Sequence, residues 1–260
     1  KRQSREMDTL ADNASPEQLA AAAAELGCRS VAFTYNDPVI FMEYALDVAA
    51  ACREQDIRSV AVTAGYIDPE PAVVFFNGID AANVDLKAFT DRFYYKLCGA
   101  HLEPVLEVLK YIRRETDCWL ELTTLLIPGE NDSDQELHAM TSWVVEELGP
   151  EVPMHFTVFH PDWKMLNHRR TPAATVSRAR RIALDNGVQY AYTGNVSDTQ
   201  GGSTWCHACG ELLVARDRYQ LGRWGLDGHG ACGKCGVRPA GYFSRPPVAA
   251  PSQPVRVRFS

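Results

Sequence analysis

Short strand-like segments alternate with segments that carry helix start and stop signals over the first 200 residues. The strand-like runs are rich in β-branched and aromatic residues and cover 30–35, 59–64, 83–87, 119–127, 154–160 and 188–193. Helices are predicted between them, from Pro16 to Gly27, Pro38 to Gln55, Pro69 to Asn77, His101 to Glu115, Ser133 to Leu148 and Pro172 to Gly187. Such alternation predicts a parallel sheet. At this length it favours a (β/α) barrel over an open doubly wound sheet.

The pattern stops near Val196 and gives way to a segment rich in cysteine and glycine. We therefore predict a barrel over residues 1–200, a small module over 201–241 and a Pro-rich, extended tail over 242–260. The sequence starts with Lys1 rather than Met and begins on a helix. We expect the barrel to be partial, with its first strand missing through truncation.

The overall composition narrows the classes of function. No apolar run approaches the roughly 18 residues that would suggest a membrane span. The formal net charge of -7 argues against bulk electrostatic binding of nucleic acid. The opening segment lacks the apolar core of a secretory signal, and eight cysteines in a chain with an ordinary core do not suggest a secreted disulfide framework. We expect a cytoplasmic protein.

Polar residues cluster near the predicted strands, whose C-terminal ends carry the active site in parallel barrels. The candidates are Tyr35, Asn36, Asp37, Thr63, Asp85, Lys87, Glu121, Thr123, His155 and His160. Residues two apart on a strand share a face, which predicts that Asp85 and Lys87 point the same way. Each candidate also has a structural interpretation: Asp37 could be only a helix N-cap, His160 a loop residue, and Asp85 with Lys87 an ion pair.

Four cysteines near the C-terminus have the spacing of a structural metal site. Cys206 and Cys209 form one CxxC knuckle, Cys232 and Cys235 form a second, and 22 residues separate the two knuckles. The glycines at 210, 233 and 236 suit tight knuckle turns. Zinc is the expected ion, with an auxiliary iron–sulfur cluster and two disulfides as alternatives.

An ordered series of segments resembles one known family. The strings are VAFTYNDPVIF, VTAGYI, NVDLKAF with YYKLCGAHLEPVLEVL, LLIPGENDSD, PMHFTVFHPDWKM and YTGNV. Together they resemble the radical S-adenosylmethionine (SAM) enzymes of the AmmeMemoRadiSam system, relatives of pyruvate formate-lyase activating enzymes, from Ser4 to about Gly241. The resemblance implies a radical SAM-type barrel that cleaves SAM at a [4Fe–4S] cluster to a 5′-deoxyadenosyl radical. It also implies an external electron donor and Memo-like or AMMECR-like protein partners, and it leaves the substrate open.

The resemblance also implies roles for individual residues. The segment 34–37 would bind the SAM amino group, although this chain has Asp37 where the family commonly has Glu. Asp85 and Lys87 would contact the amino-acid or ribose part of SAM, His155 would lie near the adenosine, and the loop 127–129 would lie near the adenine. Within the segment 34–37 the SAM candidates are Tyr35, Asn36 and Asp37, and Thr63 and Glu121 complete the set.

One departure from the family is expected to matter most. The family holds its cluster with a CxxxCxxC motif, but Cys28, Cys52, Cys98 and Cys118 are isolated. We therefore expect this chain alone to be inactive.

Two other functions stay open from the sequence. Lys87 could form a Schiff base, as in aldolases, with Asp85 or Glu121 as its acid–base partner. Alternatively, the barrel could be catalytically inactive, and the C-terminal module could bind protein or nucleic acid through Arg216, Arg218, Arg223 and Trp224.

Overall fold

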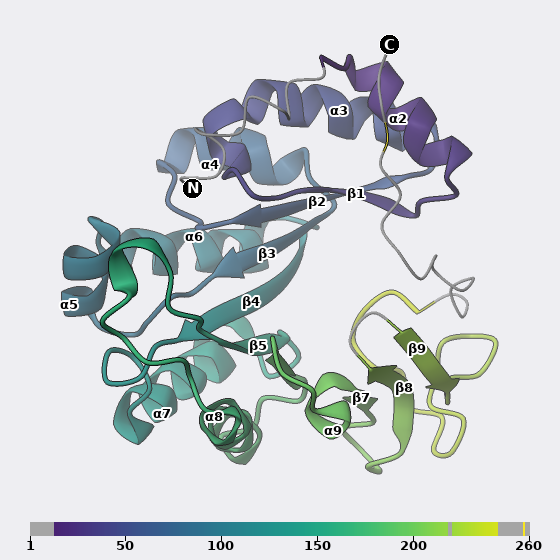
Figure 1. Cartoon of the computed structure of the whole chain (residues 1–260). Coiled ribbons are helices and arrows are strands. Elements are labelled where there is room, and N and C mark those ends of the chain that lie inside the picture. Colours follow the sequence, from purple (N-terminus) through teal and green to yellow (C-terminus); the bar gives the residue numbers. More distant parts are fainter. Residues whose placement is uncertain (1–12, 218–219, 244–256, 258–260) are drawn as a thin grey trace. The chain divides into compact units, whose positions relative to one another are not determined.

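The computed structural model describes residues 13–217, 220–243 and 257, which divide into two compact units. The first unit contains residues 13–85, 103–120 and 257, and the second contains residues 86–102 and 121–243. Strands β1 to β6 follow one another in chain order in one sheet, and β7 to β9 form a second sheet (Figure 1). The predicted α/β class is confirmed. The tail predicted over 242–260 lies mostly outside the described residues.

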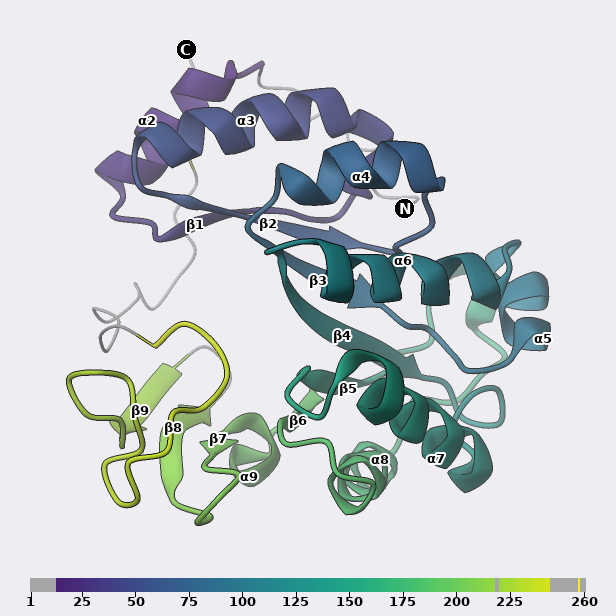
Figure 2. The same cartoon turned by 180° about the vertical axis from the view of Figure 1, so that it is seen from behind.

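The first unit pairs parallel strands with helices on one side (Figure 2). Its strands are β1 (Ser30–Phe33), β2 (Arg58–Thr63) and β3 (Ala81–Asp85). Its helices are α2 (Pro16–Glu25), the 3-10 helix η1 (Pro38–Phe41), α3 (Met42–Glu54), α4 (Pro69–Asn77) and α6 (Leu102–Glu115). The parallel register places Val31 opposite Ser59 and Val60 opposite Ala81.

Local signals explain where the first helices begin and end. The Ser15 hydroxyl accepts the Gln18 N–H at 3.2 Å and the Gln18 side chain accepts the Ser15 N–H at 2.8 Å, and these two bonds form a capping box at the start of α2. Gly27 ends this segment with a φ of 65°, a conformation that favours glycine. The helix predicted from Pro38 to Gln55 is divided, because a 3-10 turn precedes α3.

The second unit contains the remaining parallel strands and the C-terminal cysteine-rich module, which we term the ribbon and which is described over residues 201–217 and 220–241. Its parallel strands are β4 (Trp119–Leu126, from Glu121 on), β5 (Met154–Val158) and β6 (Ala191–Gly194). Its helices are α5 (Asp91–Phe93), the π-helix η2 (Tyr94–Cys98), α7 (Asp134–Trp143), the π-helix η3 (Val144–Leu148), the 3-10 helix η4 (Trp163–Met165), α8 (Ala173–Asp185) and α9 (Thr199–Gly202). The antiparallel strands are β7 (Thr204–Trp205), β8 (Leu212–Asp217) and β9 (Gln220–Trp224). Within the described residues, no helix has the length and apolar character needed to cross a bilayer.

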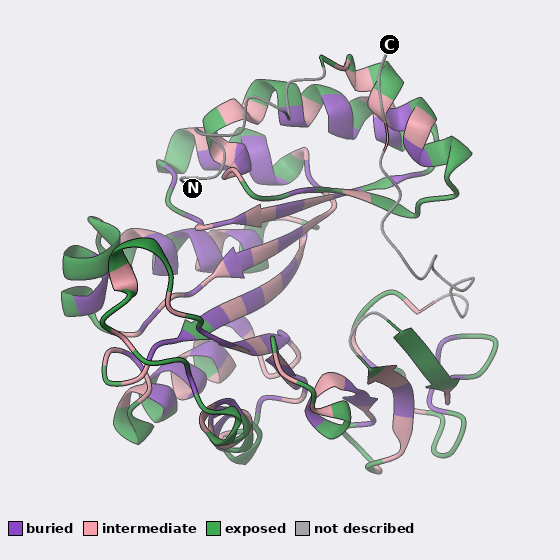
Figure 3. Ribbon diagram, viewed as in Figure 1, coloured by how far each residue is buried: buried purple, intermediate pink, exposed green. Residues whose placement is uncertain are grey.

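Burial alternates along the parallel strands, as expected when one face packs under helices (Figure 3). In the first unit, Val84 of β3 is fully buried, as are Phe75 and Phe76 of α4 and Leu109 of α6. In the second unit, Leu122 and Phe156 are fully buried, while Glu121 and His155 on the alternate face are only half-buried. Asp85, Glu121 and His155 therefore occupy the face that the helices do not cover, whereas Thr63 lies on the buried face of β2 with Ser59 and Ala61.

Asp80 connects the loop before β3 to the start of β2. Its carboxylate accepts the Ser59 N–H and hydroxyl, both at 2.8 Å, and the Arg58 guanidinium at 3.0 Å. Burial alone would raise the pKa of Asp80, but these donors outweigh burial and hold the pKa below its usual value. Because the folded-state pKa is lowered, the resulting stability is present above about pH 4 and is lost as the pH falls through the folded-state pKa.

We expect Asp80→Ala to lower the free energy of unfolding by about 2 kcal/mol at neutral pH, because it leaves the buried Ser59 groups without their acceptor. Chemical denaturation at several pH values measures this, with the exposed Asp47→Ala as the control. The difference between Asp80→Ala and the wild type should shrink below pH 4. A difference that does not change with pH would contradict the role of the charge.

Candidate functional site

The C-terminal ends of β1 and β2 are joined by one carboxylate in the first unit. Asp37 accepts the Thr63 hydroxyl at 2.7 Å through Oδ1 and the Ala64 N–H at 2.9 Å through Oδ2. It also accepts the Val39 N–H at 3.3 Å, which confirms that it caps the following helix. A carboxylate has about four lone-pair positions, so three donors leave room for about one more. Asp37 thus organises this rim and retains limited capacity for a ligand.

The other candidates of the first unit lie beside this rim. Tyr35 is 88% exposed and has a φ of 69°, which is rare for a residue with a bulky side chain. Asn36 and Asp85 are half-buried, and Asp85 is the last residue of β3. Gly65 follows Thr63 with a φ of 63°, and a Cβ there would lie 2.7 Å from Val84 Cγ1. Glycine is therefore required for this turn.

In the second unit, Lys87 follows β3 rather than lying on it. The strand covers Ala81–Asp85, so the strand predicted over 83–87 is placed two residues too far along the chain. The alternation of burial nevertheless continues through Ala88, with Lys87 half-buried between buried neighbours. The Lys87 N–H donates to the Tyr94 hydroxyl at 3.0 Å, which connects this loop to η2.

Asn131 is a fully buried residue that the sequence interpretation missed. Its side-chain oxygen accepts the Ile127 N–H at 2.7 Å, and its side-chain nitrogen donates to the Lys87 carbonyl at 2.6 Å and the Leu125 carbonyl at 3.0 Å. One amide therefore fixes the Lys87 loop, the end of β4 and the turn at 127–131. The only sequence signal for Asn131 is its position in a polar turn just after Pro128-Gly129.

Glu121 and His155 form a hydrogen-bonded pair, but not where the sequence interpretation placed them. His155 Nε2 lies 2.7 Å from Glu121 Oε2. Glu121 is the third residue of β4 and His155 is the second residue of β5, so both lie near the N-terminal ends of their strands. The expectation that they share the strand-end rim is wrong, because a period of two fixes the face of a side chain but not its height along the strand. His160 lies two residues beyond the end of β5 and is exposed.

Tyr192 extends this pair on the neighbouring strand. It pairs with His155 in the β5–β6 register, and the two rings stack with centroids 4.9 Å apart and planes 19° apart. Burial raises the pKa of Tyr192, so its hydroxyl stays protonated at neutral pH. The sequence interpretation did not select Tyr192, whose contact with His155 arises from the pairing of β5 with β6.

The four C-terminal cysteines converge, as the spacing predicts. Their sulfur atoms all lie within 4.8 Å of one another, with Cys206 and Cys235 3.6 Å apart and Cys209 and Cys232 3.7 Å apart. All eight cysteines of the chain are free thiols. The backbone N–H groups of Cys235 and Lys234 lower the pKa of the Cys232 thiol to about 7, which favours the thiolate that metals bind.

The two knuckles have matching backbone geometry. The main-chain carbonyl of Cys206 accepts the N–H of Gly210 at 2.9 Å, and that of Cys232 accepts the N–H of Gly236 at 2.8 Å. Gly210 and Gly236 have φ values of 69° and 75°. The prediction of tight glycine turns is confirmed at these two positions, and the equivalence of the knuckles suits one shared metal ion.

Comparison with known proteins then places the chain in a family, because residues 3–140 match the model of the Radical SAM superfamily. The chain belongs to the radical SAM superfamily. It is 38% identical to an uncharacterized protein of Methanocaldococcus jannaschii over 202 residues, 78% of this chain and 60% of that protein. It is 23% identical to the 4-hydroxyphenylacetate decarboxylase activating enzyme of Clostridioides difficile over 179 residues, 64% of this chain and 56% of the enzyme. This radical SAM chain thus spans about 60% or less of the length of these relatives.

Solved structures agree with a radical SAM fold. A domain of the pyruvate-formate lyase-activating enzyme from Bacteroides vulgatus matches with a TM-score of 0.56 and 17% identity, covering 64% of this chain and 98% of that domain. A radical SAM methyltransferase from Sphaerobacter thermophilus matches with a TM-score of 0.57 and 17% identity, covering 77% of this chain and 62% of that chain. The fold is therefore the parallel α/β sheet of the radical SAM partial barrel.

The remaining cysteines do not fit a cluster with three thiolate ligands. Within the described residues, the C-terminal set is the one group of three or more side chains placed to hold a metal. Cys52 and Cys118 are buried, and burial raises the pKa of Cys118 to about 12. Cys28 and Cys98 are exposed and belong to different segments. The barrel cysteines of this radical SAM chain are thus not a cluster site.

Proposed function

We propose that this chain is the SAM-binding barrel of a radical SAM enzyme of the AmmeMemoRadiSam type. The match to the Radical SAM superfamily is the observation that carries the proposal. The ordered motifs and the homology to an activating enzyme support the narrower assignment. In such enzymes a [4Fe–4S] cluster supplies the electron that cleaves SAM to a 5′-deoxyadenosyl radical. The cluster ligands would lie outside this sequence, since no CxxxCxxC occurs within it.

The SAM contacts are proposed residue by residue. In the first unit, the rim of Tyr35, Asn36, Asp37, Thr63 and Asp85 would bind the amino-acid and ribose parts of SAM. Support comes from the Asp37–Thr63 hydrogen bond, which organises the strand ends where parallel barrels bind ligands. In the second unit, Lys87, Glu121 and His155 would also bind SAM. His155 would do so from near the N-terminal end of β5.

The biological setting is also a proposal. The enzyme would abstract a hydrogen atom from its substrate, and proteins are among the candidate substrates. Memo-like and AMMECR-like proteins are the proposed partners. An external donor would supply the electron, and the proposed location is the cytoplasm.

The C-terminal cysteines are proposed to hold one structural zinc ion in a ribbon over residues 201–241, beside a barrel over residues 1–200. Four thiolates about 2.3 Å from one tetrahedral ion lie about 3.8 Å apart, close to the observed sulfur separations of 3.6 and 3.7 Å. A multi-iron cluster spreads its ligands over several metal ions and needs wider spacing. His207 is bonded to Tyr190 at 2.9 Å, which supports a bystander role for it.

The SAM site is tested by ligand affinity in the protein that carries the cluster. We expect Asp85→Asn or Lys87→Ala to weaken SAM binding about 10-fold or more, because each removes a charge that would pair with the zwitterionic end of SAM. Isothermal titration calorimetry measures this. The controls are Asp47→Asn and Lys96→Ala, which change exposed charges elsewhere. Unchanged affinity in both test variants would exclude these residues from the site.

A further inference from the structure

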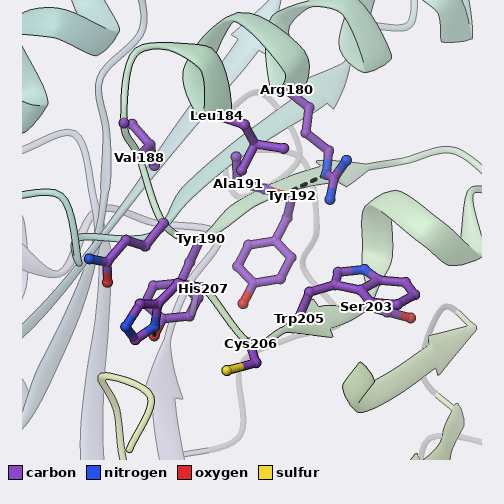
Figure 4. Close-up of a pocket in the computed structure, with 12 residues that line it drawn as sticks. Arg180, Leu184, Val188, Tyr190, Ala191, Tyr192, Ser203, Trp205, Cys206 and His207 are labelled. Atoms are coloured by element: carbon purple, nitrogen blue, oxygen red, sulfur yellow. Dashed lines mark hydrogen bonds between the residues drawn. The ribbon is translucent and has the colours of Figure 1, made fainter. Parts of the chain in front are cut away.

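Tyr190 attaches the ribbon to the barrel part of the second unit. The residue is 3% exposed and precedes β6. Its hydroxyl lies 2.9 Å from His207 Nδ1, inside the first knuckle, and accepts the Ala240 N–H at 3.1 Å, just after the second knuckle. Figure 4 shows the Tyr190 and His207 side chains meeting at this junction. One hydroxyl thus holds both knuckle segments.

Tyr192 makes the second attachment. Its hydroxyl lies 3.1 Å from Thr204 Oγ1 in β7, and the same Thr204 oxygen accepts the Arg216 guanidinium at 2.6 Å. A threonine hydroxyl offers one donor and two acceptor positions, so it can serve both partners at once. Thr204 is 1% exposed, so the loss of these bonds would leave polar groups without partners in a buried position.

The junction between the ribbon and the sheet is not filled by a continuous apolar core. A cavity of about 350 Å³ lies there, lined in part by Arg180, Tyr190, Tyr192 and Trp205 (Figure 4). The core of the ribbon is instead its own small cluster of Cys206, Leu213, Val214, Leu226 and Cys232, two of which are metal-site cysteines. The two tyrosine hydroxyls thus bond to the ribbon beside this cavity, and two of the metal-site cysteines belong to the core of the ribbon to which they bond.

The ring of Tyr192 lies on the polar face of the sheet, while its hydroxyl bonds to the ribbon. Its ring stacks on His155, and His155 is bonded to Glu121. We propose that the metal-loaded ribbon positions the His155–Glu121 pair through Thr204 and Tyr192, with Tyr192 as the positioning residue. The inference rests on the metal site of the proposed function, but not on what the pair binds.

The test follows the His155 imidazole signal by NMR in the full 260-residue chain labelled at histidine, with His155→Gln identifying that signal. We expect the stacking shift of His155 to diminish when zinc is chelated. Thr204→Val should cause a change in the same direction while one zinc per chain is retained, because it removes the hydroxyl but keeps the shape. Thr204→Ser keeps the hydroxyl and should restore the wild-type signal. His138, bonded to Asn186, is the internal control for an intact barrel.

The outcomes separate this inference from the proposed functions. A His155 signal that Thr204→Val leaves unchanged would overturn the inference, whatever metal is bound. If the His155 signal responds to Thr204→Val in a chain that binds no metal, the positioning of His155 by Thr204 and Tyr192 would stand. The role of the metal would be overturned. SAM affinity does not enter either result, so failure of SAM binding would count only against the proposed SAM site.

Discussion

Cys232→Ser is expected to abolish stoichiometric metal binding and to unfold the ribbon while the barrel stays folded. Structural zinc contributes roughly 10–16 kcal/mol of binding free energy in small zinc domains, and that energy is folding energy. The buried ribbon cluster is small and contains two of the four cysteines, so it cannot replace the metal. Aerobically purified wild-type protein should contain about one zinc per chain, as one set of four ligands implies.

Elemental analysis and limited proteolysis measure this result together. Cys28→Ser is the matched control, because Cys28 is an exposed thiol outside the metal group. It should retain zinc and resist cleavage within the ribbon. The zinc assignment would be wrong if the protein contained stoichiometric iron with a charge-transfer absorption that disappears in Cys232→Ser. The four cysteines would then form an iron site.

The 260-residue chain is expected to form no 5′-deoxyadenosine from SAM. The barrel cysteines are scattered and two of them are buried, so they offer no three-thiolate site for a cluster with an open iron. Anaerobic reconstitution with iron and sulfide, followed by reductant and SAM, tests this, with 5′-deoxyadenosine measured by mass spectrometry. The matched control is the same chain extended by a segment that carries CxxxCxxC, which should restore the product. Cleavage by the unextended chain would show that the cluster is held in another way.

The fold was predictable because its signals are local. Ser15 with Gln18, Pro69 at the start of α4, and the β-branched runs between helices each act over a few residues, and α2 and α4 begin where these signals stand. The CxxC pairs were equally legible, since each knuckle is fixed within five residues. The π-helical turns η2 and η3 were not predictable, because their widened hydrogen bonding leaves no pattern in the residue types.

The candidate site was only partly predictable because it depends on strand pairing. The sequence indicated that Glu121 and His155 share a polar face, but not that they meet near the strand starts. That height depends on the β4–β5 register, which sets Thr123 opposite His155. Tyr192 was missed for the same reason, since its contact with His155 arises from pairing between strands distant in the sequence.

The hydrogen bonds of Asn131 have a consequence for how such a barrel can diversify. The side-chain amide makes these hydrogen bonds to main-chain atoms of residues 87, 125 and 127. The bonds therefore depend on the path of the backbone and not on the side chains of those residues. Replacement of Lys87 leaves those bonds available, whereas replacement of Asn131 removes all of them. Under the proposed role of Lys87 in ligand binding, descendants of this fold could therefore exchange the chemical group at position 87 while inheriting the same loop geometry. In this sense one amide separates the evolution of specificity from that of the scaffold.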